Sequence, residues 1–387
     1  MARRQRSILS GAWLLCLGLG LWASAQAQEP LPHPELQPAM RTLFQALTHL
    51  VPWSLDPQAF QEQARRQRIL EALHTLASQA ATLETHGQQD PQPFDFLRRS
   101  LAQKARTAAQ RYSQGDFQDA SLVLRQLTEH CFACHARFTQ PQAFPLGKRF
   151  LEATPLTQLS LRDRVRLAVA TRQFDTALET CEAVLRSETL TAPMIDVLGV
   201  LEDYLKIVLR VRHDFPRART ALERFVQRSD VPFYMRERLT NWIEALQELA
   251  SEGFSGEALP RARALIEAGQ RRNRFPADQQ GLVHFVVASS LLQRYIDAPA
   301  AQPSALAEAY YLLGLAEAYV GRTSWVSETP FLLETAIRLQ PTSATASKAY
   351  SALRDYLVTQ YTGSSGTHIP PEIQANLDEL RRLLGGS

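Results

Sequence analysis

Apolar residues recur three and four positions apart along almost the whole 387-residue chain, and this spacing limits the fold more than any other feature. An α-helix brings residues three and four apart onto one face, whereas a strand places alternate residues on one face. No segment shows the alternation of polar and apolar residues that a half-buried strand needs. Hydrophobic residues make up 45% of the chain and charged residues 21%, as in ordinary globular proteins. We therefore expect an all-α protein, with more than one domain at this length.

The first part of the chain is predicted to form four helices, at residues 35–51, 57–85, 93–113 and 116–138. Helix breakers separate these segments: Pro52 and Pro57, then Gly87, Pro91 and Pro93, then Gly115 with Asp116. Short connections favour antiparallel neighbours, so we expect an up-and-down four-helix bundle over residues 28–140. The proline-containing stretch at residues 141–155 is predicted to be the linker to the second part of the chain.

The second part, residues 156–387, continues as helices in which an aromatic residue is followed by alanine three positions later. Phe174 with Ala177 and Phe215 with Ala218 are the clearest pairs. Residues 307–341 resemble a tetratricopeptide repeat, with Leu313-Gly314 in a first helix and Ala336 and Pro341 closing a second. Phe174 and Phe215 are 41 positions apart, more than the roughly 34 of that repeat, so an irregular helical domain is the alternative. In either case helix pairs must stack on their neighbours to bury their apolar faces.

The sequence Cys131-Phe132-Ala133-Cys134-His135 is the motif that carries chemistry. Two thiols at this spacing can add to the two vinyl groups of haem while the adjacent histidine ligates the iron. The motif therefore predicts one covalently attached haem c, with His135 as an iron ligand.

Three other kinds of site, namely a redox pair, a zinc site and a disulfide, could also explain this cysteine spacing. A redox Cys-x-x-Cys belongs to a thioredoxin-like α/β fold, which the helical periodicity excludes here. A structural zinc ion would need a second pair of Cys or His ligands at matching spacing, and the sequence shows none. A disulfide alone would not require His135, so haem attachment accounts best for the motif.

Residues 1–27 have the pattern of a secretory signal peptide, with three arginines, an apolar run from Ile8 to Trp22, and Ala25 and Ala27 at the cleavage site. The apolar run is short for a membrane anchor, so we expect cleavage after Ala27 and a periplasmic location. Removing this leader changes Lys+Arg 42 against Asp+Glu 39 into 39 of each. A neutral mature chain lacks the basic surplus of a nucleic-acid binder.

The predicted fourth helix places its apolar residues and the motif on one face: Phe117, Ala120, Leu124, Leu127, Cys131, Cys134, His135 and Phe138. We therefore expect the haem to face the bundle core. An exported four-helix bundle with this motif near the end of its last helix resembles the class II c-type cytochromes, the group that includes cytochrome c′. The resemblance covers residues 28–140 and implies a monohaem electron carrier or a gas-binding haem protein.

Met40 is the candidate for the second iron ligand. It lies near the start of the first helix, at the level of the end of an antiparallel fourth helix, on the stripe Leu36, Met40, Leu43, Leu47 and Leu50. The run Met40-Arg41-Thr42-Leu43 is similar to the ligand region of four-helix b-type and low-spin class II cytochromes. A methionine that only fills the core is the alternative. For His130, next to the motif, a solvated or propionate-facing position is expected instead of iron ligation.

Electron transfer through a His135/Met40 haem is the first functional hypothesis, with the second part docking a redox partner protein or a periplasmic assembly. A gas-binding or sensing haem with a vacant distal side is the second, and a periplasmic scaffold with a structural haem is the third. Haem catalysis would need a distal acid-base pair that the sequence does not display, so we do not expect an enzyme.

Overall fold

The computed structural model describes residues 36–85, 95–136, 145–252, 254–275, 278–297, 303–321, 327–364 and 366–385. In these ranges the chain is helical apart from one short antiparallel hairpin, β1 (Thr362–Gly363) with β2 (Gly366–Thr367). The predicted all-α class is therefore confirmed. The predicted leader lies outside the described residues.

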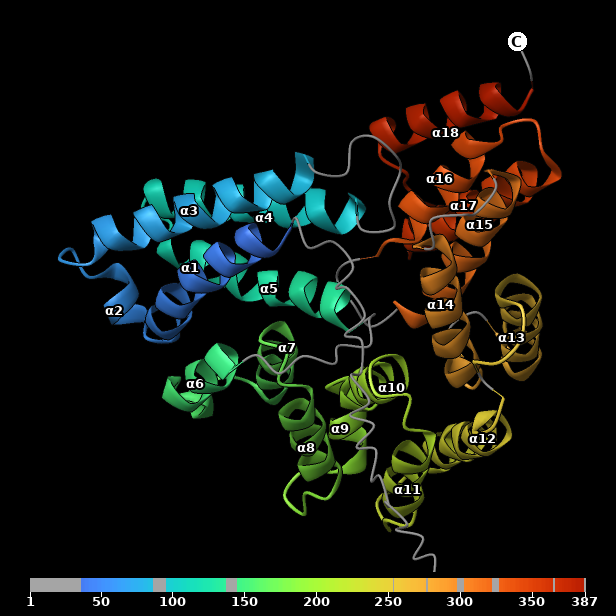
Figure 1. Cartoon of the computed structure of the whole chain (residues 1–387), viewed down its shortest axis with the longest axis horizontal. Coiled ribbons are helices and arrows are strands. Elements are labelled where there is room, and N and C mark those ends of the chain that lie inside the picture. Colours follow the sequence, from blue (N-terminus) through green and yellow to red (C-terminus); the bar gives the residue numbers. More distant parts are fainter. Residues whose placement is uncertain are drawn as a thin grey trace, which may run out of the picture.

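The first helices are α1 (Gln37–Leu55), α2 (Pro57–Gln61), α3 (Arg66–Thr85), α4 (Asp95–Ser113) and α5 (Phe117–His135). They form the left part of Figure 1, where α1 packs on α3, α3 on α4 and α4 on α5. Buried side chains from all five helices share one hydrophobic cluster, here called the first cluster. Its largest members include Leu50, Phe60, Leu73, Tyr112 and Leu124.

α4 ends at Ser113 as predicted, α5 begins one residue after the predicted start at 116, and the turn between them contains Gly115 at a φ of +84°. α5 ends at His135, before the predicted end at 138. The first two predicted helices were wrong in two places. Pro52 does not end α1, which continues to Leu55, because a proline so near the end deprives only one carbonyl of its helical N–H partner. The helix predicted over 57–85 is interrupted between α2 and α3, where Glu62 has an extended backbone although no Gly or Pro marks the break.

The remaining helices follow one another around a curve from the lower part of Figure 1 to its right side. They are α6 (Pro145–Ala153), the 3₁₀ turn η2 (Leu156–Gln158), α7 (Leu161–Ala170), α8 (Phe174–Leu185), α9 (Ala192–Val197), α10 (Val200–Arg210), α11 (Phe215–Val226), α12 (Phe233–Leu249), α13 (Ala258–Arg272), α14 (Leu282–Ile296), α15 (Pro303–Val320), α16 (Thr329–Leu339), α17 (Ala344–Gln360) and α18 (Pro371–Leu384). Their apolar faces form a second cluster.

Most helices next to each other in sequence also pack on each other in this part, as the stacking of helix pairs requires. Phe174, Ala177, Phe215 and Ala218 are all buried in the second cluster. Gly314 of α15 shows why a small residue is needed, because a Cβ there would lie 2.7 Å from Leu333 of α16. The Leu313-Gly314 pair thus marks a close crossing of two helices.

The predicted linker, residues 141–155, is not an extended connection where the structure describes it. It contains α6, in which Phe150 and Leu151 are buried. The ring of Phe150 packs edge-on against Phe44 of α1, with 5.7 Å between the ring centroids. The helix therefore connects the first helices to the second cluster through side-chain contacts.

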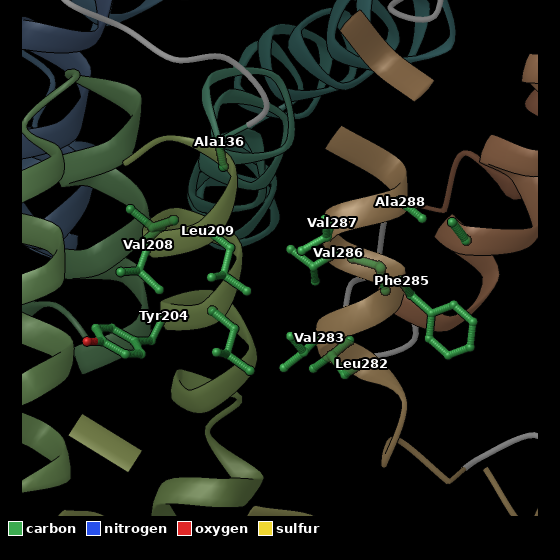
Figure 2. Packing of buried hydrophobic residues seen from close by; sticks show 14 of the residues in the cluster. Ala136, Tyr204, Val208, Leu209, Leu282, Val283, Phe285, Val286, Val287 and Ala288 are labelled. Atoms are coloured by element: carbon green, nitrogen blue, oxygen red, sulfur yellow. The ribbon is translucent and has the colours of Figure 1, made fainter. Parts of the chain in front are cut away.

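Helix α5 belongs to both clusters. Ala120, Leu124 and Leu127 lie in the first cluster. Phe132 lies in the second cluster, together with Ala136, the first residue after the helix. Figure 2 shows the second cluster close to Ala136, with Val208 of α10 and Val287 of α14 among its members. The end of α5 is therefore enclosed by helices from both parts of the chain.

Charged side chains are buried beside the same end of α5. Glu129 of α5 and Arg166 of α7 are separated by 2.5 Å, with only 5% and 10% of their side chains exposed. On the neighbouring helices, Arg210 of α10 binds Glu317 of α15 at 2.8 Å. Removing one partner of such a pair leaves an uncompensated charge in the interior, which costs far more than removing both.

We predict that Arg166→Leu alone destabilises the protein by about 3–5 kcal/mol, because it leaves the Glu129 carboxylate buried without its cation. The double variant Glu129→Leu, Arg166→Leu should recover most of this loss. Urea unfolding measures both effects, and a single variant as stable as the wild type would show that the pair does not hold α5 to α7.

Candidate functional site

The motif occupies the last turn of α5. Cys131, Cys134 and His135 are each half-buried, and neither Cys131 nor Cys134 is in a disulfide. The helix continues without interruption to His135, and the Ala136 N–H closes the last turn on the Phe132 carbonyl. Regular helical geometry therefore brings the two thiols and the imidazole to one end of the helix, as the spacing predicted.

The imidazole of His135 is oriented by α7. Its Nδ1 lies 3.2 Å from the backbone carbonyl oxygen of Val169, near the end of that helix. A carbonyl can only accept, so Nδ1 carries the proton and Nε2 keeps its lone pair. The same carbonyl accepts the N–H of Arg172 in the turn after α7, and its second lone pair is available to the imidazole.

His135 is neutral at physiological pH. Burial, and then the charge of nearby Arg172, lower the pKa of its ring to about 4. A neutral imidazole with its Nδ1–H donated to a carbonyl is the state in which histidine binds a metal through Nε2. In this state His135 could ligate haem iron, and Cys131 and Cys134 on the same helical turn could bind the haem covalently.

The prediction that the whole motif faces the bundle core needs a correction. Ala120, Leu124 and Leu127 do face the first cluster, but the ring of His135 reaches across to α7. Phe138 lies outside the described residues. The sequence could not indicate Val169, because its contribution is a backbone atom.

Met40 lies on α1, half-buried at the border of the first cluster. The centre of the α1 stripe is formed instead by Ala39, Leu43, Ala46 and Leu50. In the described structure Met40 thus packs with the first cluster while His135 bonds to α7. Its role as second ligand stays a prediction.

His130 is not solvated, contrary to the expectation from its position on the helix. It is 1% exposed, and its Nε2 lies 2.8 Å from the hydroxyl of Ser100 on α4. Burial lowers its pKa to about 4, so it is a neutral residue of the α4–α5 interface. The helical periodicity correctly placed His130 on a different side of α5 from Cys131. It did not show that α4 covers that side.

Among the described side chains no group of three His, Cys, Asp or Glu residues is placed to hold a bare metal ion. A groove of about 840 Å³ lies apart from the motif, between α8 and α11, and is lined by charged residues that include Glu182, Arg217 and Arg224. None of the helices described is long and apolar enough to cross a membrane.

Comparison of the chain with models of protein families, with curated proteins and with solved structures found no match.

We predict that Cys131 in the folded apoprotein reacts slowly with thiol reagents. Burial raises the pKa of its thiol to about 11. This pKa is about two units above the ordinary thiol value of 9.0, so the fraction of reactive thiolate near neutral pH is about 100-fold smaller. Mass spectrometry after timed alkylation measures this, with protein unfolded in urea as the control. Equal rates for Cys131 in the folded and unfolded states would contradict the prediction.

Proposed function

We propose that this chain is an exported monohaem c-type cytochrome that transfers electrons, with haem bound at Cys131, Cys134 and His135. One observation carries the proposal: the thiols and the imidazole lie on one helical turn, and the Val169 carbonyl fixes the ring so that Nε2 is available to iron. The haem would supply reversible one-electron chemistry. No catalytic turnover is assigned to it.

The chain's own residues would do three things for this group. Cys131 and Cys134 would each add S–H across one vinyl group, which forms a thioether with no loss of atoms and no need for an oxidant. His135 would ligate the iron through Nε2, with its Nδ1–H held by Val169. Met40 would complete the coordination, and a thioether ligand raises the reduction potential.

The packing of α1, α3, α4 and α5 around the first cluster supports the resemblance of residues 28–140 to the class II c-type cytochromes. The finer assignment, a four-helix bundle enclosing covalent haem, is part of the proposal. The helix pairs of the second part would form a tetratricopeptide-like array that docks a redox partner protein or a periplasmic assembly. The leader at residues 1–27 is the basis for placing the protein in the periplasm.

We expect the mature protein to keep its haem through acid-acetone extraction and to stain for haem after denaturing electrophoresis. Cys131→Ala with Cys134→Ala should abolish this signal, because no thiol is left to form a thioether. Cys181→Ala is the matched control, since Cys181 is fully buried on α8. Loss of colour from the wild-type band would refute covalent attachment.

We also expect a low-spin, six-coordinate resting spectrum that depends on Met40. Met40→Ala should produce a high-spin haem with a lower reduction potential and faster CO binding, because the sulfur ligand is lost. Met235→Ala provides the control: Met235 is fully buried on α12, so its truncation costs about 2–5 kcal/mol of stability but should leave the spectrum unchanged. A wild-type haem that is already five-coordinate would favour gas binding over electron transfer.

A further inference from the structure

Arg172 occupies a backbone position that normally belongs to glycine. It lies just after the end of α7 and has a φ of +58°. Its N–H donates to the Val169 carbonyl at 2.9 Å, and the N–H of Gln173 donates to the Ala168 carbonyl at 2.7 Å. These two bonds define a Schellman motif, in which the residue with positive φ is usually glycine because a side chain is strained there. A long cationic side chain at this position points to a role besides ending the helix.

The same turn orients the proposed iron ligand. The Val169 carbonyl oxygen accepts from both the Arg172 N–H and the Nδ1 of His135. The charge of Arg172 also contributes to lowering the pKa of His135, so the guanidinium lies near that ring. The hydrogen-bonded turn thus fixes the start of the Arg172 side chain relative to the imidazole.

Arg172 is half-buried, and none of the ion pairs among the described residues includes it. Burial lowers the pKa of Arg172, and no acidic group contributes to that shift. Within the parts of the chain that the structure describes, no Asp or Glu lies within ion-pair distance of Arg172. Arg166 on α7, by contrast, pairs with Glu129. Withdrawing a cation from water has a cost that a nearby anion offsets, so an anion beside Arg172 would be favourable.

We propose that Arg172 is a positioning residue for the haem and pairs with a haem propionate. The inference rests on the proposed function, since haem c carries two carboxylates that the protein chain does not provide. The pairing holds the haem edge against the end of α7. A positive charge at this place favours the ferrous state, so Arg172 raises the reduction potential.

Three variants separate charge from backbone strain. Arg172→Gln removes the charge, Arg172→Lys keeps it, and Arg172→Gly removes the charge while relieving the positive φ. Arg354→Gln on α17, whose side chain is 56% exposed, is the control. Arg172→Gly should fold at least as well as the wild type, so the test stands if the glutamine variant unfolds.

The readouts are the covalent haem content, the midpoint potential by spectroelectrochemical titration, and the propionate bending band in the resonance Raman spectrum. We expect full haem content in all variants. Arg172→Gln and Arg172→Gly should shift the potential downward and move the propionate band. Arg172→Lys should stay close to the wild type, and Arg354→Gln should change nothing.

An unchanged potential and propionate band in Arg172→Gly, at full haem content, would overturn the pairing. A shift in Arg172→Lys as large as in Arg172→Gly would also overturn it, because charge would then not be the cause. A wild-type protein without covalent haem is a different outcome: it refutes the proposed function, and this inference with it.

Discussion

Helix α5 is buried by a different cluster at each end, and this double burial is the constraint on which the rest of the structure depends. Its first part, with Leu124, completes the first cluster, and its last turn, with Phe132, enters the second. A helix that is buried by one cluster needs only the helices of one bundle. Helix α5 instead packs against helices that precede it in the chain and against helices that follow it. The two parts of the protein are therefore joined by a shared helix as well as by the connection through α6.

Electrostatics imposes the same requirement. Glu129 is buried beside the motif, and its cation comes from α7 in the second part of the chain. The Arg210–Glu317 pair between α10 and α15 obeys the same rule, with Ser289 of α14 bonded to both side chains. Charges taken out of water are tolerated only when they are paired and hydrogen-bonded. Charge as well as apolar contact thus holds α7 to α5, and α10 to α14 and α15.

Local periodicity predicted what depends on local sequence. It identified the helical class, the end of α4, the start of α5, the Gly115 turn and the inward face of Leu124. It failed where the outcome depends on distant contacts or weak local signals: α1 continues past Pro52, and α2 ends before α3 without a breaker. The candidate site divides in the same way. Spacing alone indicated Cys131, Cys134 and His135, but neither the cover over His130 nor the Val169 carbonyl beside His135 leaves a pattern in the sequence, because both depend on how helices far apart in the chain pack together.

The burial of the Cys131 thiol has a consequence for biosynthesis. A thiol adds to a vinyl group mainly as thiolate, and the folded environment keeps this one protonated. On the proposed function, attachment of haem would be faster while α5 is still uncovered. The helix that orients His135, α7, lies after the motif in the chain, as do α10 and α15. If the chain is exported from its N-terminus, as proposed, the motif would emerge before the helices that enclose it. The order of the elements along the chain would then provide an interval for attachment.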